Sequence, residues 1–144
     1  MKEVRLGFEL AEVSKLILDD LRESTESVGV VSSYRPFLFH LSNNKDGLTQ
    51  SELVDRIHFK APTVSLTLQK MEIDGLVRKE IDKNDQRVTR IYITELGKSF
   101  TNKIEKIHDD LENYLSSLFT NEEKEEFLDY LGRIKMKINE RKGK

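Results

Sequence analysis

Residues 49–93 hold the feature that most restricts the fold, which is two short helices in close succession followed by two short strands. Thr49-Gln50-Ser51-Glu52 has the spacing of a capping box, in which a hydroxyl and a carboxylate satisfy free backbone amides at a helix start. His58-Phe59-Lys60-Ala61 leaves room only for a tight connection before Pro62, which suits the first turn of the next helix. That second helix is expected to end near Asp74, because Gly75 closes it. The inward positions of the two helices are predicted to be Leu53, Val54, Ile57, Val64, Leu68 and Met71.

The segments 76–81 and 88–93 are rich in branched residues and have the length of strands. The polar run 82–87 between them predicts a turn, so the pair forms a hairpin. A hairpin is marginal alone and must pack on the neighbouring helices. Short helix, tight turn, second helix and hairpin together form the order of a winged helix-turn-helix.

Longer helices are predicted on both sides of this module. The first covers residues 4–25, the second starts at a Ser32-Ser33 cap with Pro36 in its first turn, and two more follow caps at Thr94 and Thr120. The terminal helices carry apolar stripes with spacings of 4 and 3 residues, such as Leu6, Leu10, Val13, Ile17 and Leu21. We expect these stripes to be buried between two copies of the chain.

The predicted fold is therefore mainly α-helical with a small β-hairpin wing. Residues 1–31 are assigned to an N-terminal dimerisation helix and connector, 32–96 to the winged helix-turn-helix, and 97–144 to C-terminal dimerisation helices. The wing and the second short helix lie in a basic stretch: residues 56–90 carry 8 Lys and Arg against 5 Asp and Glu, although the net charge of the chain is -2. A local basic face favours an anionic partner more than the global charge disfavours it.

Several classes of function are disfavoured by composition. The chain has no cysteine, and its three histidines are not spaced as metal ligands on one helix face. No phosphate-binding loop or nucleophile motif is present, so we expect no enzyme activity, no metal and no cofactor. No run is apolar enough to cross a bilayer, and the expectation is a cytoplasmic protein without a membrane partner.

The second short helix, here called the recognition helix, has a polar outward face. Short polar side chains near the N-terminal end of a helix are those that reach base edges in the major groove. Ser and Thr are poor helix formers, so their repetition gains little for the helix itself, although an ordinary solvated face is the alternative. The outward residues are Pro62, Thr63, Ser65, Leu66, Thr67, Gln69 and Lys70.

Two further sets of side chains are candidates for DNA contact. Lys60 opposes the helix dipole at the start of the recognition helix, which a nearby phosphate would offset, unless the side chain simply points away. At the hairpin tip, Arg87 suits the negative potential of the minor groove and Asp85 is placed to hold it, although Asp-Lys-Asn-Asp is also good turn chemistry without a ligand. The cations expected to supply backbone charge around the tip are Arg78, Lys79, Lys83 and Arg90.

Three stretches resemble the MarR family of bacterial regulators: GLTQSELVDRI, APTVSLTLQKMEIDGLVRKE, and DKNDQR followed by ITELG. The resemblance implies a two-fold dimer built from the terminal helices, whose winged modules read the half-sites of a pseudo-palindrome in double-stranded DNA. It matches Arg87 to the wing-tip arginine, Asp85 to its orienting aspartate, and Thr63, Ser65 and Thr67 to the groove-facing positions. One departure is Asn84, which stands where the family pattern has the first wing arginine.

The resemblance also implies release of DNA by a small aromatic or anionic ligand in a cleft between the dimer helices and the winged module. Tyr34, Arg35, Phe37 and His40 are the candidate lining residues, although packing between helices is the commoner role for Tyr34 and Phe37. An alternative function is a helical dimer whose winged module binds another protein.

Overall fold

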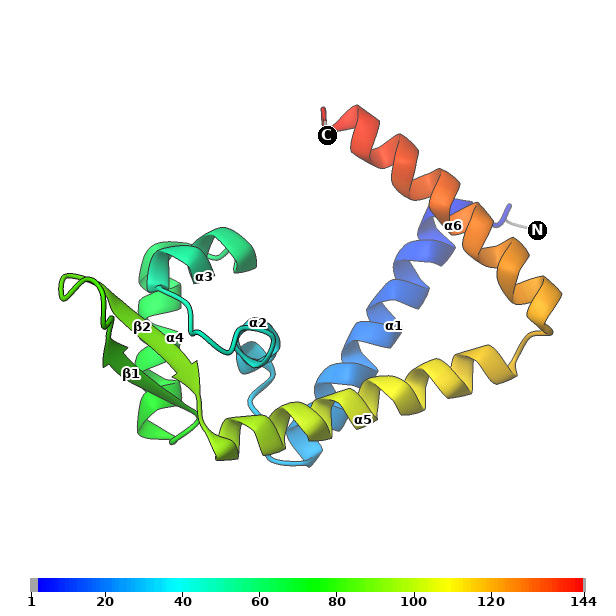
Figure 1. Ribbon diagram of the computed structural model, residues 1–144. Coiled ribbons are helices and arrows are strands. Elements are labelled where there is room, and N and C mark those ends of the chain that lie inside the picture. Colours follow the sequence, from blue (N-terminus) through cyan, green and yellow to red (C-terminus); the bar gives the residue numbers. More distant parts are fainter. Residues whose placement is uncertain (1–2, 144) are drawn as a thin grey trace. The chain divides into compact units, whose positions relative to one another are not determined.

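The computed structural model describes residues 3–143, and the described chain is mainly helical with one antiparallel hairpin, as predicted (Figure 1). It divides into two compact units, one reaching Ile107 and the other starting at His108. No helix in the described part is long and apolar enough to cross a membrane. The elements are α1 (Leu6–Ser27), a 3-10 turn η1 (Ser32–Tyr34), α2 (Arg35–Ser42), α3 (Gln50–Ile57), α4 (Ala61–Ile73), β1 (Val77–Ile81), β2 (Thr89–Ile93), α5 (Glu95–Ser117) and α6 (Asn121–Arg141).

Helices α3 and α4 form the predicted helix-turn-helix. The capping box at α3 is complete: Thr49 Oγ1 accepts from the Glu52 amide at 3.2 Å, and Glu52 Oε1 accepts from the Thr49 amide at 3.3 Å. His58 ends α3 with a left-handed φ of 64°, which reverses the chain within a few residues. Pro62 lies in the first turn of α4, where its missing amide costs nothing.

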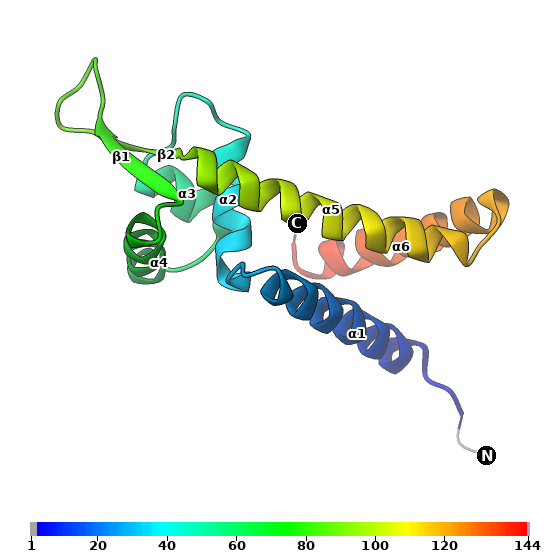
Figure 2. The same cartoon turned by 90° about the horizontal axis from the view of Figure 1, so that it is seen from below.

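Strands β1 and β2 pair from Val77–Ile93 at the base to Ile81–Thr89 near the tip, and the loop between them extends away from the helices as the wing (Figure 2). A further pair of backbone hydrogen bonds joins the hairpin to the helices. The Leu48 amide donates to the Ile91 carbonyl at 3.0 Å, and the Ile91 amide donates to the Leu48 carbonyl at 2.8 Å. Because Leu48 directly precedes the α3 cap, this bridge fixes the base of the wing beside α3.

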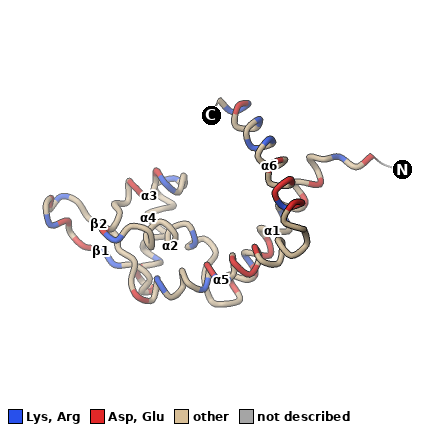
Figure 3. Tube along the Cα trace, turned by 45° about the vertical axis from the view of Figure 1, so that its right-hand side comes forward, with Lys and Arg blue, Asp and Glu red and all other residues tan. Residues whose placement is uncertain are grey.

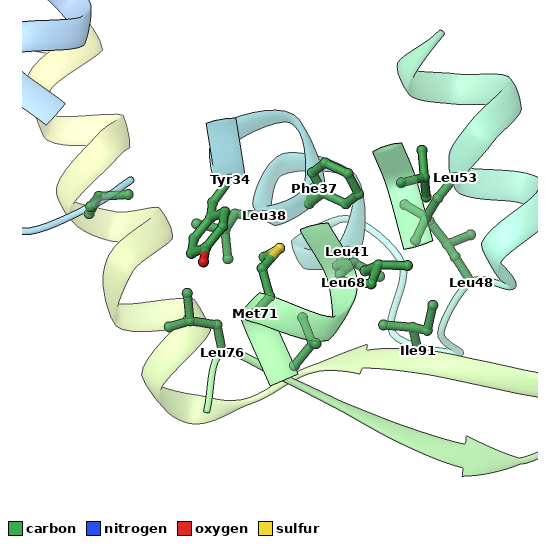
Figure 4. Packing of buried hydrophobic residues seen from close by; sticks show 13 residues of the cluster. Tyr34, Phe37, Leu38, Leu41, Leu48, Leu53, Leu68, Met71, Leu76 and Ile91 are labelled. Atoms are coloured by element: carbon green, nitrogen blue, oxygen red, sulfur yellow. The ribbon is translucent and has the colours of Figure 1, made fainter. Parts of the chain in front are cut away.

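One hydrophobic core supports this module. Phe37, Leu38, Leu53, Leu68 and Met71 are fully buried and converge from α2, α3 and α4 (Figure 4). Val64 is also fully buried, and Val54 and Ile57 pack against the cluster while partly exposed. The predicted inward faces of α3 and α4 are thus confirmed, and their opposite faces are left to solvent.

The structure corrects the start of α2 and the end of α1. Ser32 and Ser33 do not cap a helix: they lie in η1, and α2 begins at Arg35 with no side-chain cap. The first helix runs two residues beyond its predicted end, through Thr25 to Ser27. Thr25 tolerates this position because its hydroxyl donates to the Leu21 carbonyl at 2.6 Å, which satisfies a fully buried polar group.

Helices α5 and α6 begin at their predicted caps, and the terminal helices leave part of their apolar stripes exposed. Thr94 Oγ1 accepts from the Gly97 amide at 3.1 Å at the start of α5, and Thr120 closes a full capping box at α6. Leu6 and Val13 of α1 are 70% and 51% exposed, and none of the described residues of α6 is buried. The described part of a single chain therefore leaves these apolar surfaces without a partner.

Candidate nucleic-acid interface

The recognition helix α4 presents the predicted polar face. Pro62, Thr63, Gln69 and Lys70 are exposed, and so is Lys60 at the N-cap. Ser65 and Thr67 are half-buried at the edge of that face, and Leu66 is 53% exposed. Since Lys60 supplies no side-chain cap, the first amides of α4 remain open to an external acceptor.

The hydroxyl of Thr67 is already engaged within the helix. Its Oγ1 donates to the Thr63 carbonyl at 2.8 Å, a bond that satisfies the donor but leaves lone pairs free to accept. Thr67 is thus ready to accept from an amino group on a base, whereas donating to a base would require the hydroxyl to rotate. Gln69 and Lys70 keep their donors exposed.

At the wing tip, Asp85 holds Arg87 through both carboxylate oxygens. Arg87 Nε donates to Oδ1 at 3.1 Å and Nη2 donates to Oδ2 at 3.2 Å, while the Arg87 amide donates to Oδ1 at 3.0 Å. These hydrogen bonds lower the pKa of Asp85. The Arg87 side chain nevertheless remains 90% exposed, so the guanidinium is oriented and accessible at once.

The loop that carries Arg87 is shaped by Asp82, whose role was not predicted from the sequence. Asp82 Oδ1 accepts from the amides of Asn84 at 2.7 Å and Asp85 at 3.1 Å, which makes the wing a side-chain-stabilised turn. The available signal was its position at the start of a polar turn. Lysines, arginines and carboxylates alternate along this loop (Figure 3).

The other predicted hairpin cations differ in whether they are paired with carboxylates. Arg90 Nε donates to Asp82 Oδ2 at 2.5 Å, and its Nη1 lies 3.7 Å from Glu52 Oε1. Arg78 pairs with Glu80 and lies over the Tyr92 ring, and Lys79 Nζ is 3.8 Å from Glu72 Oε1. Lys83 is exposed on the wing loop. Arg87 and Lys83 are therefore the cations that the wing presents outward.

The four candidate ligand-cleft residues do not line one cleft. Tyr34 and Phe37 are 5% and 0% exposed and belong to the core, where Phe37 packs against Phe59 with ring centroids 6.3 Å apart. Tyr34 and Phe37 therefore pack between helices, which was the predicted alternative to ligand binding. His40 is half-buried with its ring edge on Phe39, and burial followed by the charge of Arg56 lowers its pKa.

Arg35 lines a separate cavity of about 260 Å³ between α1 and η1, which is shallow and open to solvent. The Arg35 Nε atom is buried and has no hydrogen-bond partner among the described residues. Arg22 also lines this cavity, and its Nη2 atom lies 3.3 Å from Asp19 Oδ1. An unsatisfied buried donor costs free energy. The lining residues are Leu18, Asp19, Arg22, Ser32, Ser33 and Arg35.

A helix-turn-helix backed by a hairpin wing, with a polar outer helix and an arginine at the wing tip, defines the winged helix-turn-helix class. Residues 33–88 match the model of the MarR family. Over its winged helix-turn-helix module the chain is therefore similar to the MarR family.

Two relatives come from Bacillus subtilis (strain 168), and both are described as uncharacterized HTH-type transcriptional regulators. YdgJ is 25% identical over 141 residues, which cover 96% of this chain and 82% of that protein. YybA is 26% identical over 92 residues, which cover 64% of this chain and 61% of that protein.

Among solved structures, the chain is similar to MepR, a transcription regulator of the Staphylococcus aureus multidrug efflux pump MepA. That structure has a TM-score of 0.83 at 23% identity and covers 94% of this chain and 99% of its own. A MepR–DNA complex has a TM-score of 0.75 at 24% identity and covers 94% of this chain and 99% of its own. At these identities the likeness establishes the shared fold.

Proposed function

We propose that this chain is a sequence-specific DNA-binding regulator that acts in the cytoplasm as a homodimeric repressor on a pseudo-palindromic operator. The observation that carries the proposal is the wing tip, where Asp85 orients a 90% exposed Arg87 on the same module as the open face of α4. Binding to DNA would cost little conformational entropy at this surface, because the Arg87 side chain and helix α4 are ordered before binding.

Each part of this surface has a matching feature of the duplex. An α-helix enters the major groove, where the Gln69 amide suits adenine and Lys70 suits guanine or a phosphate. The Arg87 guanidinium suits the narrow minor groove, whose potential is most negative there. We assign DNA contact to Lys60, Pro62, Thr63, Ser65, Thr67, Gln69, Lys70, Lys83 and Arg87, with Asp85 orienting Arg87.

The exposed apolar side chains of the terminal helices support a homodimer. Leu6 and Val13 of α1 are 70% and 51% exposed, and Phe127 and Ile138 of α6 are 45% and 41% exposed. Apolar stripes of this length on a soluble regulator are best buried against a second copy, which also gives the two-fold symmetry that a palindrome requires. We assign residues 1–31 and 97–144 to dimerisation and 32–96 to DNA binding.

The cavity beside Arg35 supports release by a small anionic or aromatic ligand. A carboxylate there would accept from the buried Arg35 Nε and gain the charge of Arg22. Screening of aromatic carboxylates for loss of operator binding tests this part. Arg35→Gln should abolish the response of an active compound while leaving operator affinity in its absence unchanged, and an unchanged response would remove Arg35 from the ligand site.

The decisive experiment combines selection of bound duplexes from a random pool with salt titration of the selected site. A palindrome should emerge, and Arg87→Ala should reduce the slope of log Kd against log salt by about 1. Arg133→Ala on α6 is the matched control, since Arg133 is exposed and paired with an aspartate like Arg87, and its slope should stay that of the wild type. Undetectable binding to any duplex at low salt would refute the proposal.

A second candidate is a dimer whose winged module binds another protein. The net charge of -2 and the presence of Asn84 in the wing favour it. In that case, neutralising Lys70 and Arg87 together would leave regulation intact, whereas changes on the terminal helices would abolish it. Loss of regulation on neutralising the two cations would exclude this candidate.

A further inference from the structure

Arg90 occupies a junction between the wing and the helix-turn-helix. Its side chain is 31% exposed, in contrast to the 90% of Arg87 nearer the tip. The next residue of β2, Ile91, is the one bridged to Leu48, so the start of α3 lies directly beside Arg90. The guanidinium contacts a carboxylate of α3 on one side and a carboxylate of the wing on the other.

On the helix side the partner is Glu52. Its Oε1 lies 3.7 Å from Arg90 Nη1 and also accepts from Thr49 Oγ1 at 3.1 Å. The same carboxylate closes the capping box of α3, and it is therefore fixed to the start of the helix rather than free on the surface. Arg90 is thus tied to a rigid point of the helix-turn-helix.

On the wing side the partner is Asp82, whose side chain is only 13% exposed. One oxygen accepts from Arg90 and the other accepts from the amides of Asn84 and Asp85. The hydrogen bond from Arg90 lowers the pKa of Asp82, which keeps this group a carboxylate. The position of the Asp85 backbone, and with it the Asp85–Arg87 pair, depends on where Asp82 is held.

We propose that Glu52, Arg90 and Asp82 form a brace that fixes the wing on the helix-turn-helix, and that Arg90 supports DNA binding as a positioning residue rather than as a phosphate contact. The role in DNA binding rests on the proposed function. A two-stranded hairpin is marginal by itself, and the brace supplies a side-chain link from the α3 cap to the loop that carries Arg87.

The two roles of Arg90 predict opposite effects of Asp82→Asn. If Arg90 were a phosphate contact, removal of a neighbouring negative charge would free it and reduce repulsion, so DNA affinity would rise. If the brace positions the wing, the same substitution breaks the link and DNA affinity falls. Asparagine has nearly the shape of aspartate, and so the comparison isolates the charge.

The experiment measures operator affinity of Asp82→Asn, Arg90→Gln and the double variant, together with NMR hydrogen exchange of the Asn84 and Asp85 amides without DNA. The brace predicts that each single variant raises Kd by about tenfold, and that the double variant raises it no further because one link is broken in all three. It also predicts faster exchange of both amides in both single variants. Asp129→Asn and Arg133→Gln, an exposed pair 2.9 Å apart on α6, provide the matched control cycle and should change neither quantity.

Tighter DNA binding by Asp82→Asn with additive weakening by Arg90→Gln would overturn the brace and make Arg90 a direct contact. Unchanged affinity and exchange in both variants would overturn it as well. If the wild-type protein bound no duplex, the proposed function would fail, and the amide exchange of the same variants would still decide whether Arg90 holds the wing.

Discussion

Tyr34 Oη donates a 2.9 Å hydrogen bond to Oδ2 of Asp74, which links η1 to the C-cap of the recognition helix. A carboxylate at the C-terminal end of a helix is unfavourable against the helix dipole, and the tyrosine hydroxyl compensates part of that cost. Tyr34 also precedes Arg35, whose side chain lines the cavity beside α1. One turn of chain therefore contacts both the end of α4 and the wall of the candidate ligand cavity.

Tyr34→Phe removes this link without changing the volume of the core. We expect the free energy of unfolding to fall by about 1.5 kcal/mol. The charged acceptor makes this hydrogen bond stronger than a neutral one, and the solvent exposure of Asp74 keeps its contribution at the lower end of the range for charged acceptors. Urea unfolding measures the change. Tyr114→Phe is the control: Tyr114 is 65% exposed, and its loss of hydroxyl should leave stability unchanged. Equal stability of Tyr34→Phe and wild type would show that the link contributes nothing.

The same hydroxyl predicts a pH dependence at the alkaline end. Burial, and then the hydrogen bond to Asp74, raises the pKa of Tyr34 from 10.0 to about 12. Because the folded state binds this proton more tightly than the unfolded state, the resulting stability is complete below pH 10 and is lost as the pH rises toward 12. Wild type should lose more stability than Tyr34→Phe over this interval in urea unfolding. Parallel pH profiles of the two proteins would contradict the assignment.

Local signals in the sequence predicted most of the fold. The hydroxyls of Thr49 and Thr120 form the capping boxes that their spacing indicated, because a capping box involves only neighbouring residues. Ser32 and Ser33 carry the same kind of signal yet lie in a 3-10 turn. Tyr34, the last residue of that turn, is buried in the core, and tertiary packing of this kind is not encoded in a local pattern.

In the candidate interface, too, the features set by neighbouring residues were predictable and those set by distant residues were not. The outward face of α4 follows from helical periodicity alone, and the pairing of Asp85 with Arg87 follows from their closeness in a short loop. The pairing of Arg90 with Glu52 does not, since the backbone bridge between Leu48 and Ile91 brings these residues together. Contacts between residues far apart in the chain are set by tertiary packing and were beyond the sequence patterns.

Gly97 packs α5 closely against the hairpin base. A Cβ at this position would contact the Leu76 carbonyl oxygen and lie 2.6 Å from Ile93 Cγ1. Gly97→Ala should therefore lower the free energy of unfolding by about 1–3 kcal/mol through overpacking. At Gly7 of α1 a Cβ would meet nothing within 4 Å, so Gly7→Ala should be neutral or slightly stabilising. Similar urea midpoints for the two variants would show that α5 can shift away from the hairpin base without loss of stability.

Asn84 gives the wing one cation fewer than the family pattern. The residue is exposed and contributes only its backbone amide to the loop, through the 2.7 Å bond to Asp82, so a longer side chain fits there. Asn84→Arg should strengthen operator binding at low salt and steepen the slope of log Kd against log salt by about 1. Asn139→Arg on α6 adds the same charge at an exposed site and should leave the slope as it is. An unchanged slope for Asn84→Arg would place residue 84 away from the DNA.

The terminal helices provide the test of assembly. Leu111 of α5 is half-buried and Ile134 of α6 is 36% exposed, although both lie on apolar stripes. If these stripes are covered by a second copy, Leu111→Asp or Ile134→Asp places a charge in an apolar interface and should give monomers or unfolded protein. Sedimentation velocity measures the mass, and circular dichroism separates a folded monomer from an unfolded chain. Asn113→Asp adds the same charge at an exposed position of α5 and should leave the dimer intact. Folded, DNA-binding dimers from both stripe variants would show that the copies meet through another surface, because a buried carboxylate without a partner could not be accommodated at either site.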